Sequence, residues 1–139
     1  MRVAVSIWKD RLSPVLDVAC RLLVVSIHER REQYRFEADI MDQSITRICQ
    51  MLKHLSVDTL ICGAVSAEYL KALRDSGLTV IPGIAGTTRE IVEAFIAGSL
   101  LQPQYFLPGR MNGQPAGGTT RQRKKRKARK DTDTSGIEP

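Results

Sequence analysis

Three cysteines are the side chains of this sequence best suited to bind a soft metal. They are Cys20, Cys49 and Cys62, and their odd number and wide spacing argue against a disulfide framework. A thiolate is a preferred ligand of iron and of iron–sulfur clusters. Because no C-x-x-C and no H-x-x-x-H occurs, the spacing does not indicate a structural zinc site.

Cys62 ends the apolar stretch "DTLIC" and is followed by Gly63. If this stretch is a parallel strand, Cys62 lies at the carboxyl end, where open α/β sheets bind ligands. A neighbouring helix N-terminus would favour a thiolate there. The alternative is that Cys62 is a small buried core residue.

Cys20 opens the apolar stretch "CRLLVVSI", after a loop that leaves the first predicted strand. The loop could bring Cys20 to the same sheet edge as Cys62, so we predict these two as metal ligands, with core packing as the alternative for each. Cys49 adjoins an apolar helical stripe, which favours packing.

The segment "PGIAGTT", residues 82–88, is a second candidate binding element. Gly83 and Gly86 allow close backbone approach, and Thr87 can cap a helix. With Gly63, these residues are predicted to contact a cofactor or an anion. A tight strand-to-helix turn explains the same pattern, and the chain lacks a dinucleotide or P-loop fingerprint.

We expect no enzymatic activity. A two-metal nuclease needs carboxylates on its first strand, and "RVAVSI" has none. His28 and His54 lie in polar surroundings that are typical of the surface, and no arrangement for nucleophilic catalysis is apparent.

The positive charge is confined to the C-terminal part. Residues 1–109 contain 12 Lys and Arg against 12 Asp and Glu, so the net charge of +6 belongs to residues 110–139, with 9 against 3. A run of basic residues there would bind nucleic acid non-specifically, or an acidic partner, or would only keep the chain soluble. The run comprises Arg121, Arg123, Lys124, Lys125, Arg126, Lys127, Arg129 and Lys130.

Hydrophobic periodicity predicts one α/β domain over residues 1–102 and a disordered tail over 103–139. The expected order is β-β-β-α-β-α-β-α, with a mixed five-stranded sheet. The strands are residues 2–7, 20–27, 34–40, 58–62 and 78–81; the helices are 42–55, 66–77 and 87–98. Residues 8–19 are expected to be a loop.

Three stretches carry a resemblance to a known family: "RVAVSI", "RLSPVLDVACRLLVVSI" and "VDTLICGAVSAEYLKALRDSGLTVIPGIAGTTREIVEAFIAGSL". Together they resemble the dinitrogenase iron-molybdenum cofactor biosynthesis family over about residues 1–101. Many members have His-Phe-Gly where this sequence has Val15, Leu16 and Asp17. The resemblance implies a ribonuclease H-like fold and a carrier of an iron–sulfur or iron–molybdenum cluster precursor, with a cluster donor or acceptor as partner.

The alternative function is a non-catalytic regulatory or scaffold module that the basic tail tethers to nucleic acid or to an acidic protein. The start "MRVAVSIWKD" is not typical of a signal peptide, and no apolar run is long enough to span a membrane. We therefore expect a cytoplasmic protein, without a membrane partner, whose exposed hairpin edge could pair with another strand.

Overall fold

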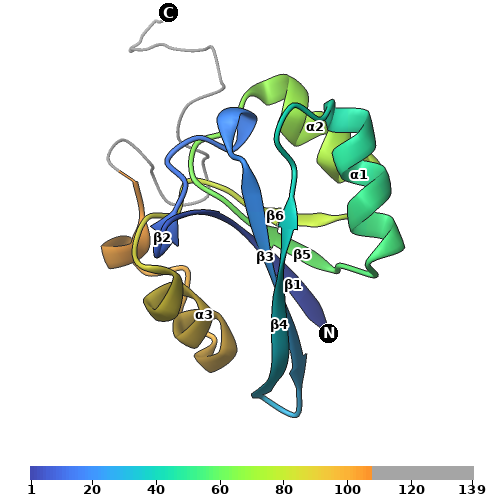
Figure 1. Cartoon of the computed structure of the whole chain (residues 1–139). Helices are drawn as coiled ribbons and strands as arrows, with labels where there is room; N and C mark the ends of the chain where they lie inside the picture. Colours follow the sequence, from blue (N-terminus) through green and yellow to red (C-terminus); the bar gives the residue numbers. More distant parts are fainter. Residues whose placement is uncertain (108–139) are drawn as a thin grey trace, which may run out of the picture.

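A computed structural model describes residues 1–107 of the chain as a mixed α/β domain (Figure 1). Its strands are β1 (Arg2–Trp8), β2 (Arg11–Leu12), β3 (Arg21–His28), β4 (Arg31–Asp39), β5 (Thr59–Ile61) and β6 (Thr79–Ile81). Its helices are α1 (Ile45–His54), α2 (Ala67–Asp75) and α3 (Thr88–Ala97), with short 3-10 helices at Leu16–Val18 and Pro103–Tyr105. The predicted α/β class is confirmed.

The sheet is mixed, with the order β4-β3-β1-β5-β6. Strands β1, β3 and β4 pair antiparallel, whereas β1, β5 and β6 run parallel. The prediction of five strands missed β2, which pairs with β1 inside the segment that we expected to be a loop. Two residues are too few to show a periodicity, so the pattern could not reveal this strand.

Alternation along β1 separates two cores on opposite faces of the sheet. Val3, Val5 and Ile7 join the core under α3, whereas Ala4 joins the core under α1 and α2. Figure 1 shows the same three layers, with α3 on one side of the sheet and α1 and α2 on the other. The two faces arise because successive strand side chains point in opposite directions.

The helix boundaries follow from their capping residues. Ser44 caps α1, with its side chain accepting a hydrogen bond from the backbone of Arg47. Ser66 caps α2, and Thr87 forms a capping box with Glu90 at the start of α3. These side-chain oxygens accept hydrogen bonds from backbone N–H groups of the first helical turn, which have no acceptor inside the helix.

Residues 103–107 are ordered, which corrects the prediction that disorder begins at residue 103. The backbone of Ala85 donates to Tyr105 at 2.7 Å, and that of Leu107 donates to Gly83 at 2.9 Å. Tyr105 and Phe106 also pack against the core under α3. The basic run of residues 121–130 lies outside the described residues.

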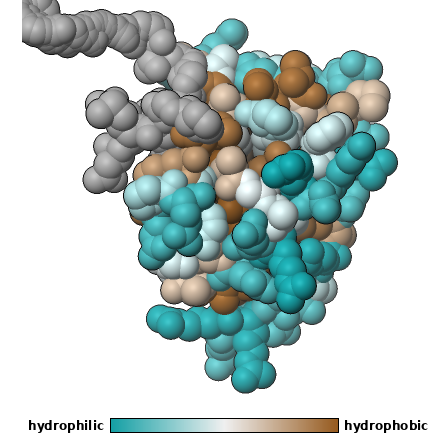
Figure 2. Space-filling view, turned by 90° about the vertical axis from the view of Figure 1, so that its left-hand side faces the viewer, coloured by the Kyte–Doolittle hydropathy of each residue, from teal (hydrophilic) through white to brown (hydrophobic). Residues whose placement is uncertain are grey.

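The surface differs in character between the two ends of the sheet. The lower end in Figure 1, which carries the turn between β3 and β4, is hydrophilic in Figure 2. More apolar residues appear on the upper half of the face shown in Figure 2. Within residues 1–107, no helix is both long and apolar enough to cross a membrane.

Candidate functional site

Cys62 lies inside the core under α1 and α2, with none of its surface exposed. The loop after β2 covers it: Leu16 belongs to the same core and is 2% exposed. Two backbone hydrogen bonds of 2.8 Å hold this loop against the chain after β5, from Ala64 to Pro14 and from Leu16 to Ala64. The position favours the packing interpretation of Cys62, and its role as a metal ligand stays a prediction.

Position 63 requires a glycine because the same loop passes very close to its backbone. A Cβ atom at this position would lie 2.5 Å from the carbonyl oxygen of Pro14 and 2.6 Å from that of Ser13. Such distances are far inside van der Waals contact, so only a residue without a side chain fits. Close approach of the chain to itself explains this glycine without a ligand.

In the turn of residues 82–88, which we predicted to bind a ligand, backbone N–H groups already donate hydrogen bonds to other parts of the protein. The N–H groups of Gly83, Ile84 and Ala85 donate to the carbonyl groups of Gly63, Cys62 and Tyr105. Those of Thr87 and Thr88 donate to Glu90 and Asp10. Because these donors already have acceptors, the contacts favour the interpretation of a tight strand-to-helix turn.

Gly86 fits the same interpretation. It has a φ of 148°, and a Cβ there would meet the side chain of Ile91 at 3.1 Å. Its carbonyl accepts from Leu12 of β2, at 3.1 Å. The conformation therefore explains both the glycine and its contact with the strand that the sequence pattern missed.

The N-terminus of α2 is likewise closed by the protein itself. The carboxylate of Asp17 accepts from the backbone of Ser66 at 3.0 Å, and the Ser66 hydroxyl accepts from Tyr69 at 3.2 Å. A carboxylate is favoured there because the helix dipole places positive potential at this end. Asp17 therefore supplies, from within the protein, the anionic group at this helix N-terminus.

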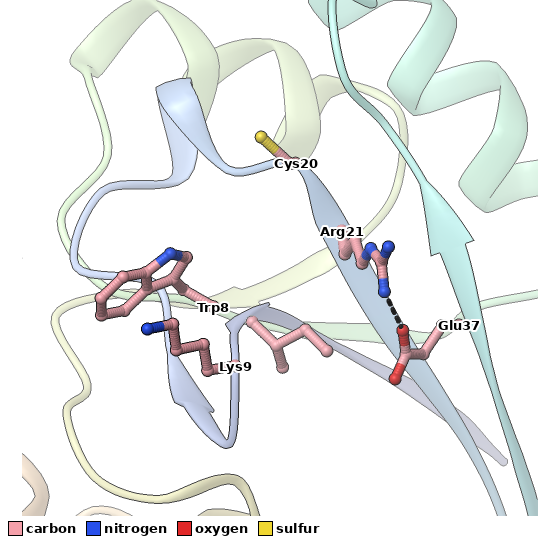
Figure 3. Close-up of a pocket in the computed structure, with 6 residues that line it drawn as sticks. Trp8, Lys9, Cys20, Arg21 and Glu37 are labelled. Atoms are coloured by element: carbon pink, nitrogen blue, oxygen red, sulfur yellow. Dashed lines mark hydrogen bonds and ion pairs between the residues drawn. The ribbon is translucent and has the colours of Figure 1, made fainter.

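Cys20, in contrast, is exposed and lines a surface pocket (Figure 3). It lies just before β3 instead of inside the strand, which corrects the predicted boundary by one residue. The pocket has a volume of about 270 Å³. Its lining residues are Ile7, Trp8, Lys9, Cys20, Arg21 and Glu37, and Cys62 is not among them.

A second pocket of about 470 Å³ adjoins the first, since both are lined by Ile7, Lys9 and Glu37. It extends past the turn after β1 to the start of α3, where Thr88 and Arg89 line it. We call the two pockets together the Trp8 groove. Its charged lining comprises four basic residues, Lys9, Arg21, Arg35 and Arg89, and two acidic residues, Asp10 and Glu37.

The turn between β1 and β2 presents the aromatic wall of the groove. Trp8 pairs with Arg11, so Lys9 and Asp10 form a two-residue turn, with Lys9 at a φ of 59°. The Lys9 ammonium lies 4.8 Å from the centre of the Trp8 ring, a cation–π distance. Trp8 stays 56% exposed, which is unusual for the largest apolar side chain.

Ion pairs hold the other basic side chains of the groove. Arg21 contacts Glu37 at 3.0 Å, and Arg35 contacts Glu32 at 2.5 Å. The hydrogen bond with Glu32 raises the pKa of Arg35, and the same bond lowers the pKa of Glu32. Arg21 and Arg35 therefore line the groove as ion-paired side chains that remain partly exposed.

Cys20 lines the groove, whereas Cys62 is buried and does not, so the role of the two as joint metal ligands stays a prediction. Within residues 1–107, no three His, Cys, Asp or Glu side chains group closely enough to hold a metal ion. Sequence reasoning also missed Trp8 and Lys9, the groove residues that flank Cys20. The signal was available in retrospect, because a tryptophan followed by two charged residues is an unlikely end for a buried strand.

The comparisons with known proteins identify shared architecture. No family model matches the sequence, and no curated protein matches it. The crystal structure of a protein named PH0822 superimposes with a TM-score of 0.67 at 17% identity, over 72% of this chain and 92% of that one.

A crystal structure of a "putative dinitrogenase" from Methanocaldococcus jannaschii gives a TM-score of 0.59 at 20% identity, over 72% of this chain and 91% of that one. An NMR structure of the same protein, with its source given as Methanococcus jannaschii, gives 0.56 at 20% identity, over 79% and 95%. At these identities the likeness shows the fold alone.

Proposed function

We propose that this protein is a non-catalytic carrier of an iron–sulfur or iron–molybdenum cluster precursor in a nitrogenase-related, cytoplasmic pathway. The fold that it shares with structures described as "putative dinitrogenase" supports the pathway. The proposal includes a ribonuclease H-like relationship, which the order β4-β3-β1-β5-β6 supports. Its main support is the exposed Cys20 in a groove whose charged lining has four basic residues against two acidic ones.

In this proposal the cargo binds in the Trp8 groove. Thiolate-ligated clusters carry negative charge, so Lys9 and Arg21 would attract one toward the sulfur of Cys20. Trp8 would shield one side of the cargo from water. A single protein thiolate leaves the other coordination positions to the ligands of the donor or acceptor protein, which suits transfer better than storage.

Cys62 would serve as a second ligand only after the loop over it had moved. Leu16 would have to leave the core, and the backbone bonds between this loop and Ala64 would have to break. Burial of a large aliphatic side chain is worth about 1.5–3 kcal/mol, so this opening is costly. We therefore assign the primary ligand role to Cys20.

Anaerobic reconstitution tests the proposal. The full chain would be incubated with iron and sulfide or with extracted cofactor, desalted, and examined by absorption, EPR and iron analysis. We expect a retained cluster in the native protein and its loss in Cys20→Ser. The matched control is Cys49→Ser, because Cys49 is half-buried and lies outside the groove.

Two results would count against the carrier proposal. A native protein that retains no iron contradicts it outright, and full retention in Cys20→Ser contradicts the assigned ligand. If the single variant Cys62→Ser loses the cluster as Cys20→Ser does, the prediction of two cysteine ligands gains support over the version with one thiolate. Circular dichroism of each variant separates a lost ligand from a lost fold.

The distribution of charge supports a second candidate, a neutral module tethered by its basic tail. The run of residues 121–130 contains 8 basic residues and no aromatic side chain that could stack on bases. Binding would therefore depend on phosphates and fall steeply with salt. Removing residues 110–139 should abolish binding to a labelled DNA duplex at moderate salt, and unchanged binding would exclude the tether.

A further inference from the structure

Strand β4 forms one edge of the sheet. Within residues 1–107 it pairs only with β3, and most of its nine residues are exposed. An edge strand presents a row of backbone N–H and C=O groups that can pair with another strand. At nine residues, β4 is the longest strand of the sheet, and its pairing with β3 is regular from Tyr34 to Asp39, beyond a register shift at Glu32.

The two faces of β4 differ in chemistry. Phe36 and Ala38 lie opposite Val24 and Leu22, so they belong to the face under α1 and α2 together with Tyr34. Arg35 and Glu37 lie opposite Val25 and Leu23, on the face of α3. The strand therefore has an apolar row on one face and a charged row, in which Arg35 precedes Glu37, on the other.

We propose that two copies of this chain pair antiparallel through β4, with Phe36 opposite Phe36 of the second copy. A two-fold axis perpendicular to the sheet relates the copies, so the pairing is centred on one residue and each side chain meets another on the same face. This constraint leaves only a few registers. The proposal does not depend on the proposed carrier function.

Charge complementarity selects among these registers. Centring on Phe36 places Arg35 opposite Glu37 of the second copy, and this favourable pair occurs twice. Centring on Arg35 or on Glu37 instead sets two like charges directly opposite each other, which is destabilising. Centring on Tyr34 leaves Arg35 opposite Gln33, and places this contact at the register shift between Tyr34 and Glu32, where regular pairing is interrupted.

The apolar face favours the same register. Centring on Phe36 brings the two Phe36 rings together and sets each Tyr34 opposite Ala38 of the second copy. Tyr34 and Phe36 already stack within one chain, with ring centres 6.4 Å apart. Pairing would extend this stack across the axis and cover Tyr34, which is 47% exposed. It would also place both Trp8 grooves on one face of a continuous sheet.

Sedimentation velocity over a protein concentration series tests the pairing with the full chain. We expect the native protein to shift from the mass of one chain to that of two. Arg35→Glu and Glu37→Arg should each abolish the dimer, because each sets like charges opposite each other. The combined exchange Arg35→Glu/Glu37→Arg should restore it. Arg47→Glu, an exposed position on α1, is the control for an equal change in net charge.

The combined variant separates pairing between copies from pairing within a chain. The exchange breaks the intramolecular ion pairs of Arg35 with Glu32 and of Arg21 with Glu37, so these cannot account for a restored dimer. A native protein that stays monomeric overturns the proposal. So does a folded combined variant that fails to dimerise, or single variants that still do.

Amide hydrogen exchange gives an independent readout that needs no substitution. Outward-facing amides of β4 should become protected as the native concentration rises, whereas the amides of β6, at the other edge of the sheet, should not change. Protection that is independent of concentration would contradict pairing through β4.

Discussion

The carboxylate of Asp17 accepts a hydrogen bond of 3.0 Å from the backbone N–H of Ser66. One side chain thus fastens the loop before β3 to the start of α2. Because Leu16 lies in the same short 3-10 helix and belongs to the core around Cys62, this contact helps to keep the cysteine enclosed. The enclosure of Cys62, which directly follows β5, therefore involves a loop that is distant from it in the sequence.

Replacing Asp17 with Ala should loosen this loop. The variant loses a charge-assisted hydrogen bond and leaves the Ser66 N–H without its acceptor, so we expect a loss of about 1–2 kcal/mol in the free energy of unfolding. Urea denaturation measures it. Asp17→Asn, which keeps an acceptor oxygen, should lose less; equal losses would show that the hydrogen bond is unimportant.

The three thiols should differ in reactivity according to their exposure. Cys20 is exposed, Cys49 is half-buried and Cys62 is fully buried, so the rates of labelling by a thiol reagent should fall in that order. We expect Cys62 to react only when the fold opens, at least about a hundredfold more slowly than Cys20. Labelling of single-cysteine variants measures each rate, and equal rates for Cys20 and Cys62 would contradict the burial described above.

Gly63→Ala should be costly because the new methyl group would meet backbone oxygens instead of flexible side chains. The carbonyl of Pro14 would lie 2.5 Å away and cannot move without breaking the loop's hydrogen bonds. Forced overpacking of this kind costs about 1–3 kcal/mol. Thermal or urea denaturation measures the loss.

The matched control is Gly77→Asn. Gly77 has a φ of 93° and no atom within 4 Å of a built Cβ, and asparagine is tolerated in this region of backbone conformation. We expect a smaller loss there. If both substitutions cost the same, close approach of the loop is not what requires the glycine.

Local patterns predicted most of the fold. The helix limits follow from single capping residues such as Ser66, Thr87 and Gly98, and the capping role predicted for Thr87 is confirmed. The hairpin of β3 and β4 follows from alternation on both sides of a polar turn. Helix limits and hairpins depend on residues that are close together in the sequence, so local sequence patterns could predict them.

The candidate site was harder to predict because it depends on long-range backbone contacts. The pairing of Arg11 with Thr87, and that of Val15 with Ala64, joins segments that share no local signal. These contacts cover the end of β5 and occupy the turn before α3. The sequence could place Cys20 and Cys62 near strand ends, but it could not show that Cys62 is buried and Cys20 exposed.

The ion pair of Glu32 and Arg35 should give a small, pH-dependent contribution to stability. Because the hydrogen bond from Arg35 lowers the pKa of Glu32 in the folded state, the unfolded chain binds the proton more readily. The contribution is therefore complete above the usual pKa of a glutamate, and it is lost as pH falls through the lowered value. Both side chains are partly exposed, so we expect about 0.2–1 kcal/mol.

A double-mutant cycle with Glu32→Gln and Arg35→Gln measures this contribution. Urea denaturation at low protein concentration, which keeps association between copies out of the result, gives the coupling energy at neutral pH and again in acid. The coupling should be favourable at neutral pH and should vanish in acid, where Glu32 is protonated, and it should weaken with added salt. A coupling that persists unchanged in acid would mean that packing, and not charge, joins these two side chains.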